Sequence, residues 1–206
     1  PAYVVAEMSA NHLGDFSRAE AIVRKAAEAG ADAVKLQTYT PDSMTLAVDS
    51  PMFRVDEGSP WAGRLLHDLY REAMTPWEWH APLKELAESL GMALFSSPFD
   101  AAAVDFLHDL DVPAYKIASF EIVDIPLLKR VAETGKPVML STGMAGEDEI
   151  AEAVDTLRDA GLRAIALLHC ISDYPASPGA MRLRAIPWLA TRFHVAAGLS
   201  DHSPGS

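Results

Sequence analysis

Seven short apolar runs alternate with amphipathic segments along this chain of 206 residues. A continuously apolar strand needs cover on both faces, and helices with one apolar face supply that cover. The alternation therefore predicts an α/β fold with a parallel sheet. The expected strands are residues 3–8, 33–37, 92–96, 114–118, 137–141, 164–170 and 194–200.

Local signals predict where the helices begin and end. Residues 17–20 (Ser-Arg-Ala-Glu) have the form of a capping box, and residues 75–78 (Thr-Pro-Trp-Glu) place a proline at the first helical position. Asp100 and Asp124 are expected to cap the next two helices. Two further helices are expected over 147–160 and 181–192. Glycines end four of these helices: Gly30, Gly91, Gly135 and Gly161.

Polar residues follow nearly every expected strand. An open doubly wound sheet concentrates such residues at one switch point, whereas a barrel uses the carboxyl ends of all its strands. We therefore expect a TIM (β/α)₈-type barrel in preference to an open sheet. The sequence stops soon after the seventh strand, so we expect a barrel truncated there, forming a single incomplete domain over residues 1–206.

One connection breaks the regular spacing. Residues 38–74 separate the second strand from its helix and contain a helix-like segment at 65–74. Connections of this length are uncommon unless they are functional or form structure of their own. The segment is either a lid over the carboxyl ends of the strands or a structural insertion.

Composition narrows the classes of partner and location. The net charge is −12, from 17 basic and 29 acidic residues, which disfavours nucleic acid or an anionic membrane as a partner. The single Cys170 excludes an internal disulfide and a multi-cysteine metal site. Neither a membrane-length apolar run nor a leader peptide is recognisable, so a cytoplasmic location is expected.

Two lysines finish otherwise apolar strands. Moving an ammonium group out of water is costly unless an anion meets it, so Lys35 and Lys116 need a partner. The expected strand-end serines could complete an anion site through charge-assisted hydrogen bonds. Alternatively, each lysine extends to the rim and pairs with an acid, or one of them forms a Schiff base.

Other strand ends carry groups that can act as acids, bases or metal ligands. Glu7 follows the first strand and is either catalytic or part of an ordinary ion pair. Asp201 and His202 follow the seventh strand, where His202 could be a metal ligand. His169 and Cys170 are interpreted as core or supporting residues. The remaining histidines in helical or edge positions are expected to be structural: His80, His108 and His194.

Five segments together resemble the sialic acid synthase family. They are residues 6–14 (AEMSANHLG), 31–38 (ADAVKLQT), 116–121 (KIASFE), 140–144 (LSTGM) and 198–202 (GLSDH). The likeness covers the whole chain in order. Within the family, Ala-Ser-Phe-Glu at 118–121 and Ser-Asp-Tyr-Pro at 172–175 are most similar to pseudaminic acid synthases.

The resemblance implies condensation of phosphoenolpyruvate with an open-chain 2-acetamido sugar, releasing phosphate. The implied sugar is 2,4-diacetamido-2,4,6-trideoxy-altrose, which gives pseudaminate; N-acetylneuraminate and legionaminate synthases are the alternatives. The residues implied to hold phosphoenolpyruvate are Lys35, Ser97, Lys116, Ser119, Ser141 and Ser200. Those implied to contact the sugar are Gln37, Glu121, Ser172 and Tyr174.

The family also implies a divalent metal, Mn²⁺ or Mg²⁺, with His202 as one of two histidine ligands. Glu7 is implied to stabilise a cationic intermediate or to position water. Full-length members form homodimers and add an eighth strand and an antifreeze-like domain, both of which we expect to be absent here. The expected outcome is weak or no turnover by this chain alone. A Schiff-base aldolase and a non-catalytic ligand-binding fragment remain as alternatives.

Overall fold

The computed structural model describes residues 2–57 and 61–204, which form two compact units, 1–112 and 113–206. Each unit has a parallel sheet whose strands lie in sequence order. The assignment of a single domain stays a prediction. None of the helices in the described ranges is both long and apolar enough to cross a membrane.

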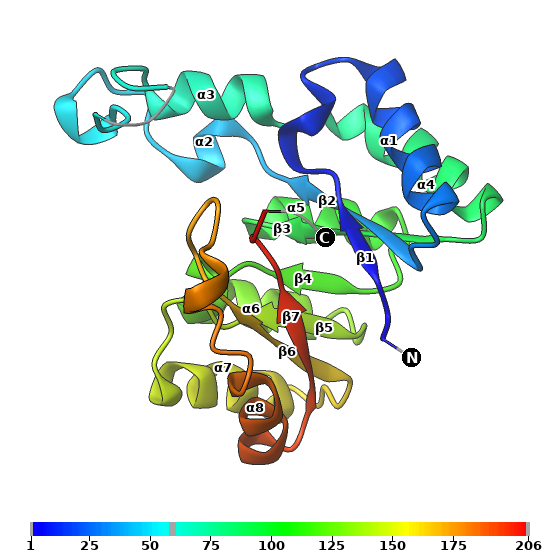
Figure 1. Ribbon diagram of the computed structural model, residues 1–206, viewed down its shortest axis with the longest axis vertical. Coiled ribbons are helices and arrows are strands. Elements are labelled where there is room, and N and C mark those ends of the chain that lie inside the picture. The colour runs from blue at the N-terminus through cyan, green and yellow to red at the C-terminus, as the bar shows by residue number, and fades with distance from the viewer. Residues whose placement is uncertain (1, 58–60, 205–206) are drawn as a thin grey trace. The chain divides into compact units, whose positions relative to one another are not determined.

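The first unit is a three-stranded sheet covered by helices (Figure 1). Its strands are β1 (Val5–Glu7), β2 (Ala33–Thr38) and β3 (Ala93–Pro98). Its main helices are α1 (Phe16–Glu28), α4 (His80–Ser89) and α5 (Ala101–Asp109), of which α1 packs against α4, and α4 and α5 pack against β3. Shorter elements are η1 (Ser9–His12), α2 (Pro41–Met44), η2 (Pro51–Phe53), α3 (Leu66–Ala73) and η3 (Trp77–Trp79).

The register of the first sheet separates two sets of side chains. Glu7 pairs with Lys35, and Gln37 pairs with Ser97. Paired residues on neighbouring strands, and residues two apart on one strand, share a face. These four polar side chains therefore lie on one face of the sheet. The alternate residues face the helices and form the core: Val34, Leu36 and Leu94 are almost fully buried beside Leu83 and Val23.

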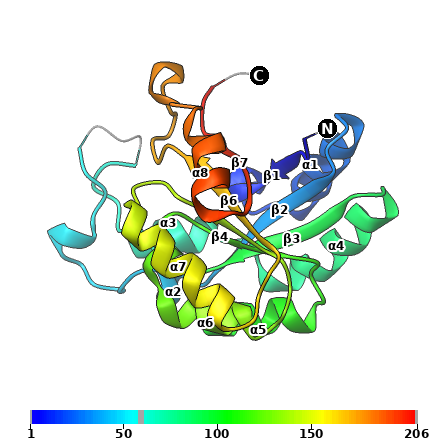
Figure 2. The same cartoon turned by 90° about the horizontal axis from the view of Figure 1, so that it is seen from below.

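The second unit has four parallel strands and three main helices. The strands are β4 (Tyr115–Ile117), β5 (Val138–Ser141), β6 (Ile165–Cys170) and β7 (Ala196–Ser200). The helices are α6 (Ile125–Ala132), α7 (Glu147–Asp159) and α8 (Ala185–Phe193), and the short turns are η4 (Phe120–Val123) and η5 (Pro178–Ala180). Helix α6 packs against α7, and α8 packs against β6 and β7 (Figure 2).

The second sheet also has one polar and one apolar face. Lys116 pairs with Met139, two residues before Ser141. Ser141 in turn pairs with Leu168, two residues before Cys170, which pairs with Ser200. Lys116, Ser141, Cys170 and Ser200 therefore share a face. The opposite face carries buried aliphatic side chains: Ile117, Leu140 and Leu167.

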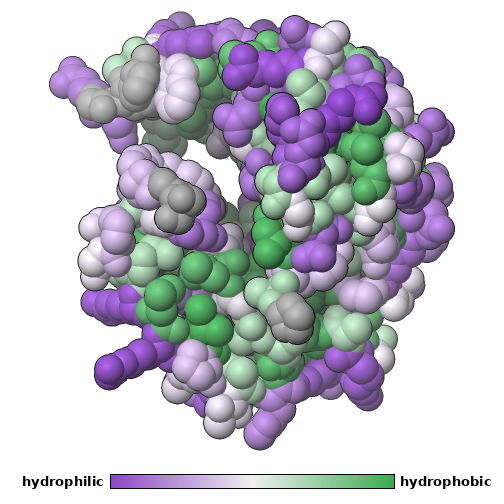
Figure 3. Space-filling view, turned by 45° about the vertical axis from the view of Figure 1, so that its right-hand side comes forward, coloured by the Kyte–Doolittle hydropathy of each residue, from purple (hydrophilic) through white to green (hydrophobic). Residues whose placement is uncertain are grey.

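The polar face of the second sheet is incompletely covered along its strands. Met139, Ala166, Leu168 and Gly198 are half-exposed, and Ala196 is exposed. Apolar residues reach the surface in several places of the space-filling view (Figure 3). Exposed apolar residues are ordinary for a protein surface when they are scattered, but here they line one face of a sheet.

The helix starts confirm two of the predicted caps and correct two others. The Asp100 and Asp124 carboxylates accept hydrogen bonds from the third residue of α5 and α6, as predicted. Helix α1 is capped instead by Asp15, whose carboxylate accepts from the Ser17 and Arg18 amides. The predicted capping box at 17–20 is therefore wrong, because a better acceptor lies two residues earlier.

The second correction concerns residues 75–78. They lead into the turn η3, and α4 begins only at His80. The Thr75 hydroxyl bonds to the His12 imidazole at 3.2 Å instead of capping the helix. The predicted helix at 181–192 is also shorter than expected, because η5 and an irregular segment precede α8.

The Asp15 cap gives a direct test of the first correction. Asp15→Ala removes the acceptor of two amide groups and should lower the free energy of unfolding by about 1 kcal/mol. Ser17→Ala is the matched control and should change it by less than about 0.5 kcal/mol. Urea unfolding measures both, and a larger loss for Ser17→Ala would restore the capping-box interpretation.

Candidate functional site

Lys35 lies within a small polar group on the first sheet. Its ammonium pairs with the Glu7 carboxylate and donates to the Ser97 hydroxyl at 3.4 Å. The other Glu7 oxygen accepts from the Ser9 amide at 3.2 Å, and the Lys35 side chain is only 15% exposed. Glu7 therefore neutralises Lys35 in this structure. An anion that binds Lys35 would have to compete with Glu7 for the ammonium group.

A separate polar network occupies the opposite, helix-facing side of the same sheet. The buried Thr38 hydroxyl contacts His80 Nε2 at 2.7 Å and the Ser96 hydroxyl at 2.6 Å. Burial lowers the pKa of His80 to about 4, so this imidazole is neutral near pH 7. His12 is also fully buried and bonds to Thr75. His80 thus connects α4 to β2 on the face opposite Lys35, whereas His12 connects η1 to the segment before η3.

Lys116 is the corresponding cation of the second unit. It is 5% exposed, and its ammonium donates to the Ile117 carbonyl at 2.8 Å. Glu121 follows on η4, directly after β4. Burial raises the pKa of Glu121, although the positive charge of Lys116 acts in the opposite direction. Because Lys35 and Lys116 belong to different units, their convergence on one ligand stays a prediction.

Three buried polar atoms at the strand ends of the second unit have no hydrogen-bond partner: Glu121 Oε2, Ser141 Oγ and Ser172 Oγ. They follow β4, end β5 and follow β6, respectively. Buried polar atoms are nearly always paired, because an unpaired one costs about 1–3 kcal/mol. Such a concentration is typical of a site whose missing partners belong to a ligand or to ordered water.

One ring nitrogen of His202 is engaged by the backbone. Its Nδ1 lies 3.0 Å from the Ile171 carbonyl oxygen. A carbonyl can only accept, so Nδ1 donates and the lone pair of Nε2 remains available. The Tyr174 ring stacks on the His202 imidazole with 4.1 Å between the ring centroids, and so covers one face of the imidazole.

One histidine alone is an incomplete donor set. Within the parts of the chain that the structure describes, no cluster of three or more histidine, cysteine, aspartate or glutamate residues is placed to hold a metal. His202 therefore fits the role of one ligand. The rest of the predicted Mn²⁺ or Mg²⁺ site stays a prediction.

The remaining predicted residues occupy strand ends as well. Gln37 is half-buried on the polar face of β2, and Ser200 is half-buried at the end of β7. Ser119 immediately precedes η4. Tyr174 is 76% exposed in the loop after β6. His169 contacts the Met181 carbonyl at 2.6 Å, which agrees with its predicted supporting role.

Sequence reasoning missed the importance of Gly143, which was noted only as part of a motif. A Cβ at this position would approach the hydroxyl oxygens of Ser119 and Ser172 to within 3.0 Å. The φ angle of Gly143 is not positive, so the backbone conformation does not require a glycine at this position. Glycine is needed because Ser119 and Ser172 leave no space for a side chain, and nothing in the sequence alone indicates this.

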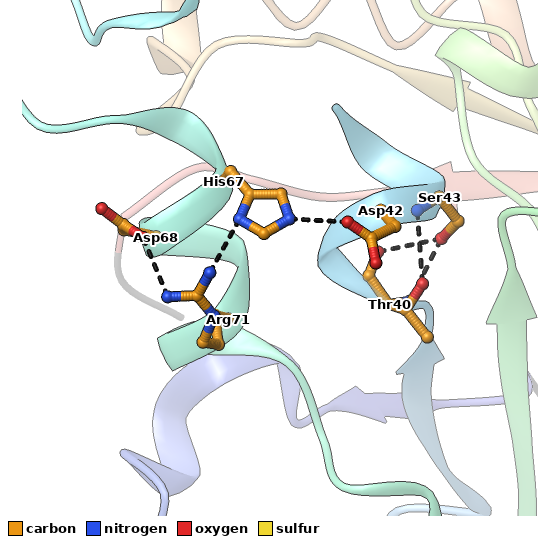
Figure 4. A network of polar contacts seen from close by, with 6 residues as sticks. All are labelled: Thr40, Asp42, Ser43, His67, Asp68 and Arg71. Carbon is orange, nitrogen blue, oxygen red and sulfur yellow. Dashed lines mark hydrogen bonds and ion pairs between the residues drawn. The ribbon is translucent and has the colours of Figure 1, made fainter. Parts of the chain in front are cut away.

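The long connection between β2 and α4 forms structure of its own. In it, α2 packs against α3. His67 Nε2 lies 2.8 Å from the Asp42 carboxylate, and Arg71 donates to His67 Nδ1 at 3.0 Å (Figure 4). Arg71 also pairs with Asp68 at 2.9 Å. These contacts tie α2 to α3, while the alternative of a lid stays a prediction.

The shifted pKa of Glu121 predicts a pH-dependent stability. The folded state holds this proton more tightly than the unfolded state, so stability should fall as the pH rises above about 4.5. Glu121→Gln cannot ionise and should lose less stability over the same range. Urea unfolding between pH 4 and pH 8 should show the variant gaining relative to the unaltered protein. Parallel curves would contradict the assigned burial effect.

Comparison with known proteins identifies relatives of this chain. The pseudaminic acid synthase of Helicobacter pylori is 45% identical over 206 residues, which cover all of this chain and 60% of the relative. The N,N′-diacetyllegionaminic acid synthase of Legionella pneumophila is 35% identical over 98% of this chain and 58% of the relative. The chain thus spans about 60% of the length of these proteins.

A solved structure supports the fold assignment. The N-acetylneuraminic acid synthetase of Leptospira borgpetersenii, in complex with citrate, matches with a TM-score of 0.86 and 31% identity. The match covers all of this chain and 66% of that one. It confirms the predicted α/β fold of TIM (β/α)₈-barrel type. The NeuB family profile matches residues 22–206, and the chain therefore belongs to the NeuB family.

Proposed function

We propose that this chain contributes to a nonulosonic acid synthase, which condenses phosphoenolpyruvate with an open-chain 2-acetamido sugar. The observation that carries the proposal is the group of three unpartnered polar atoms on Glu121, Ser141 and Ser172. All three come from the carboxyl ends of neighbouring strands, where barrel enzymes bind their substrates. Membership of the NeuB family supports the same reaction.

Phosphoenolpyruvate would be held by lysine ammonium groups and serine hydroxyl groups. Charge-assisted hydrogen bonds from lysine and serine suit its phosphate and carboxylate groups. In the first unit Lys35 and Ser97 are already hydrogen-bonded to each other. In the second unit Lys116, Ser141 and Ser200 share a sheet face, with Ser119 at the end of β4.

The sugar would contact the remaining polar residues. Gln37, Glu121, Ser172 and Tyr174 offer amide, carboxyl and hydroxyl groups suited to hydroxyl and acetamido substituents. The similarity to the Helicobacter pylori protein favours 2,4-diacetamido-2,4,6-trideoxy-altrose as the substrate and pseudaminate as the product. Legionaminate and N-acetylneuraminate are the alternative products.

The proposed reaction joins the two substrates and then removes phosphate. C3 of phosphoenolpyruvate attacks the sugar aldehyde carbon, which forms the new C–C bond and leaves a cation at C2. Water adds to C2, and the resulting tetrahedral intermediate breaks its C–O bond to phosphate to give the ketoacid. The Glu7 carboxylate would stabilise the cation or position the water. A divalent metal on His202 would supply polarisation of the aldehyde oxygen.

The proposal extends to the setting of the enzyme. A homodimer in the cytoplasm, formed by the natural protein that carries this chain, would suit a biosynthetic enzyme of this family. Neither nucleic acid nor membrane is part of the proposal, because the net charge of −12 disfavours both as partners.

The reaction can be tested with the natural protein that carries this chain. Supplied with phosphoenolpyruvate, Mn²⁺ and competing amino sugars, it should release one inorganic phosphate per nine-carbon ketoacid, with the mass of pseudaminate dominating. Ser141→Ala should lower kcat/KM for phosphoenolpyruvate about tenfold through loss of one hydrogen bond to a charged group. Ser17→Ala, an exposed control, should leave it unchanged.

Three outcomes would contradict the proposal. Borohydride trapping of a substrate on Lys35 or Lys116, without phosphate release, would identify a Schiff-base aldolase. Binding of phosphoenolpyruvate without turnover of any amino sugar would identify a non-catalytic ligand-binding protein. A dominant N-acetylneuraminate product would overturn the choice of sugar while keeping the reaction.

A further inference from the structure

Gly143 lies where the loops after three neighbouring strands meet. It follows β5 by two residues, while Ser119 follows β4 and Ser172 follows β6. The position that a Cβ of Gly143 would take is within 3.0 Å of both serine hydroxyl oxygens and 3.3 Å from Ser119 Cβ. Real Cβ atoms essentially never come this close to other atoms, so a side chain at 143 must displace at least one hydroxyl.

Of the two hydroxyl groups, that of Ser172 is the less stabilised by the protein and is therefore the easier to displace. Its oxygen is buried and has no hydrogen-bond partner. A hydroxyl held in a buried position without a partner is costly, and a ligand that accepts or donates a hydrogen bond would remove the cost. The missing side chain of Gly143 is what gives this hydroxyl its place.

The loop that carries Ser172 is also fastened to His202. The Ile171 carbonyl accepts from His202 Nδ1 at 3.0 Å, and the Ala176 amide donates to the His202 carbonyl at 2.9 Å. Tyr174 stacks on the imidazole ring between these two contacts. Ser172 is therefore held near the residue that would support the aldehyde end of the sugar.

We infer that Gly143 is a positioning residue for sugar binding: by lacking a side chain, it lets the Ser172 hydroxyl point at a polar substituent of the amino sugar. This inference rests on the proposed synthase function. The partner is an uncharged hydroxyl or acetamido group, because a single hydroxyl is suited to such a group and the cations lie on other residues. Gly143 has no side chain to contact the sugar and acts only through the position of the Ser172 hydroxyl.

Steady-state kinetics of the natural protein that carries this chain tests the inference. Gly143→Ala and Ser172→Ala should each raise KM for the amino sugar about tenfold. KM for phosphoenolpyruvate should change less than about twofold in Ser172→Ala, and should rise less than the sugar KM in Gly143→Ala, whose Cβ also meets Ser119. The double variant should be no worse than either single variant, because both remove the same hydrogen bond. The control Gly179→Ala should change neither constant, since its Cβ would meet nothing nearer than 3.8 Å.

The outcomes separate this inference from the function on which it rests. Absence of phosphate release by the unaltered protein would contradict the synthase function itself. If the unaltered protein turns over, three results would overturn the role of Gly143: an unchanged sugar KM in Gly143→Ala, an equal rise in both KM values, or additive effects in the double variant. A general loss of folding would lower the apparent kcat without raising either KM, and Ser172→Ala, which adds no atoms, then tests the hydrogen bond by itself.

Discussion

Placing ammonium and hydroxyl groups at the buried ends of apolar strands is the constraint on which the rest of this structure depends. Lys116 is 5% exposed, and Ser141 is 2% exposed on the same sheet face. Desolvation of such groups is unfavourable unless partners compensate for the lost water. The Ile117 carbonyl compensates part of the cost at Lys116, whereas Ser141 Oγ has no hydrogen-bond partner among the residues that the structure describes.

The two units meet this constraint in different ways. In the first, Lys35 pairs with Glu7 and contacts Ser97, so its charge is compensated inside the protein. In the second, several polar atoms remain without partners, and burial keeps the pKa of Glu121 raised. An anion at Lys35 would therefore have to replace an existing ion pair, whereas Ser141 Oγ and Ser172 Oγ have no such competing partner among the described residues. Glu7 would be released for another role when an anion takes its place.

Much of this organisation could be predicted from the sequence because it depends on short-range signals. Gly30 and Gly91 have positive φ after the helices they were predicted to end, and Asp100 and Asp124 cap as expected. Hydrophobic patterning also predicts that Lys35 and Lys116 belong to strands, although both lie within β2 and β4 and not at their last residues. The resemblance of five short segments to a known family was equally visible, and the comparisons confirm it.

Other features could not be predicted, because they depend on contacts between distant segments. Thr75 bonds to His12, 63 residues away, and so does not cap a helix. Similarly, the sequence indicates only an ordinary turn residue at Gly143, because the contacts with Ser119 and Ser172 come from distant segments. The ion pair of Glu7 with Lys35 was one of two open interpretations. The register of β1 against β2 places both residues on one face and allows this ion pair to form, while a catalytic role of Glu7 stays a prediction.

Titration calorimetry with phosphoenolpyruvate tests most directly the proposal that Lys35 and Lys116 each contribute to binding of this anion. In the natural protein that carries this chain, Lys35→Met and Lys116→Met should each raise Kd at least tenfold, because each removes a charged hydrogen-bond donor. Lys25→Met, whose side chain is 75% exposed, serves as the control and should leave Kd unchanged. Binding by either strand-end variant as tight as that of the control would contradict the account.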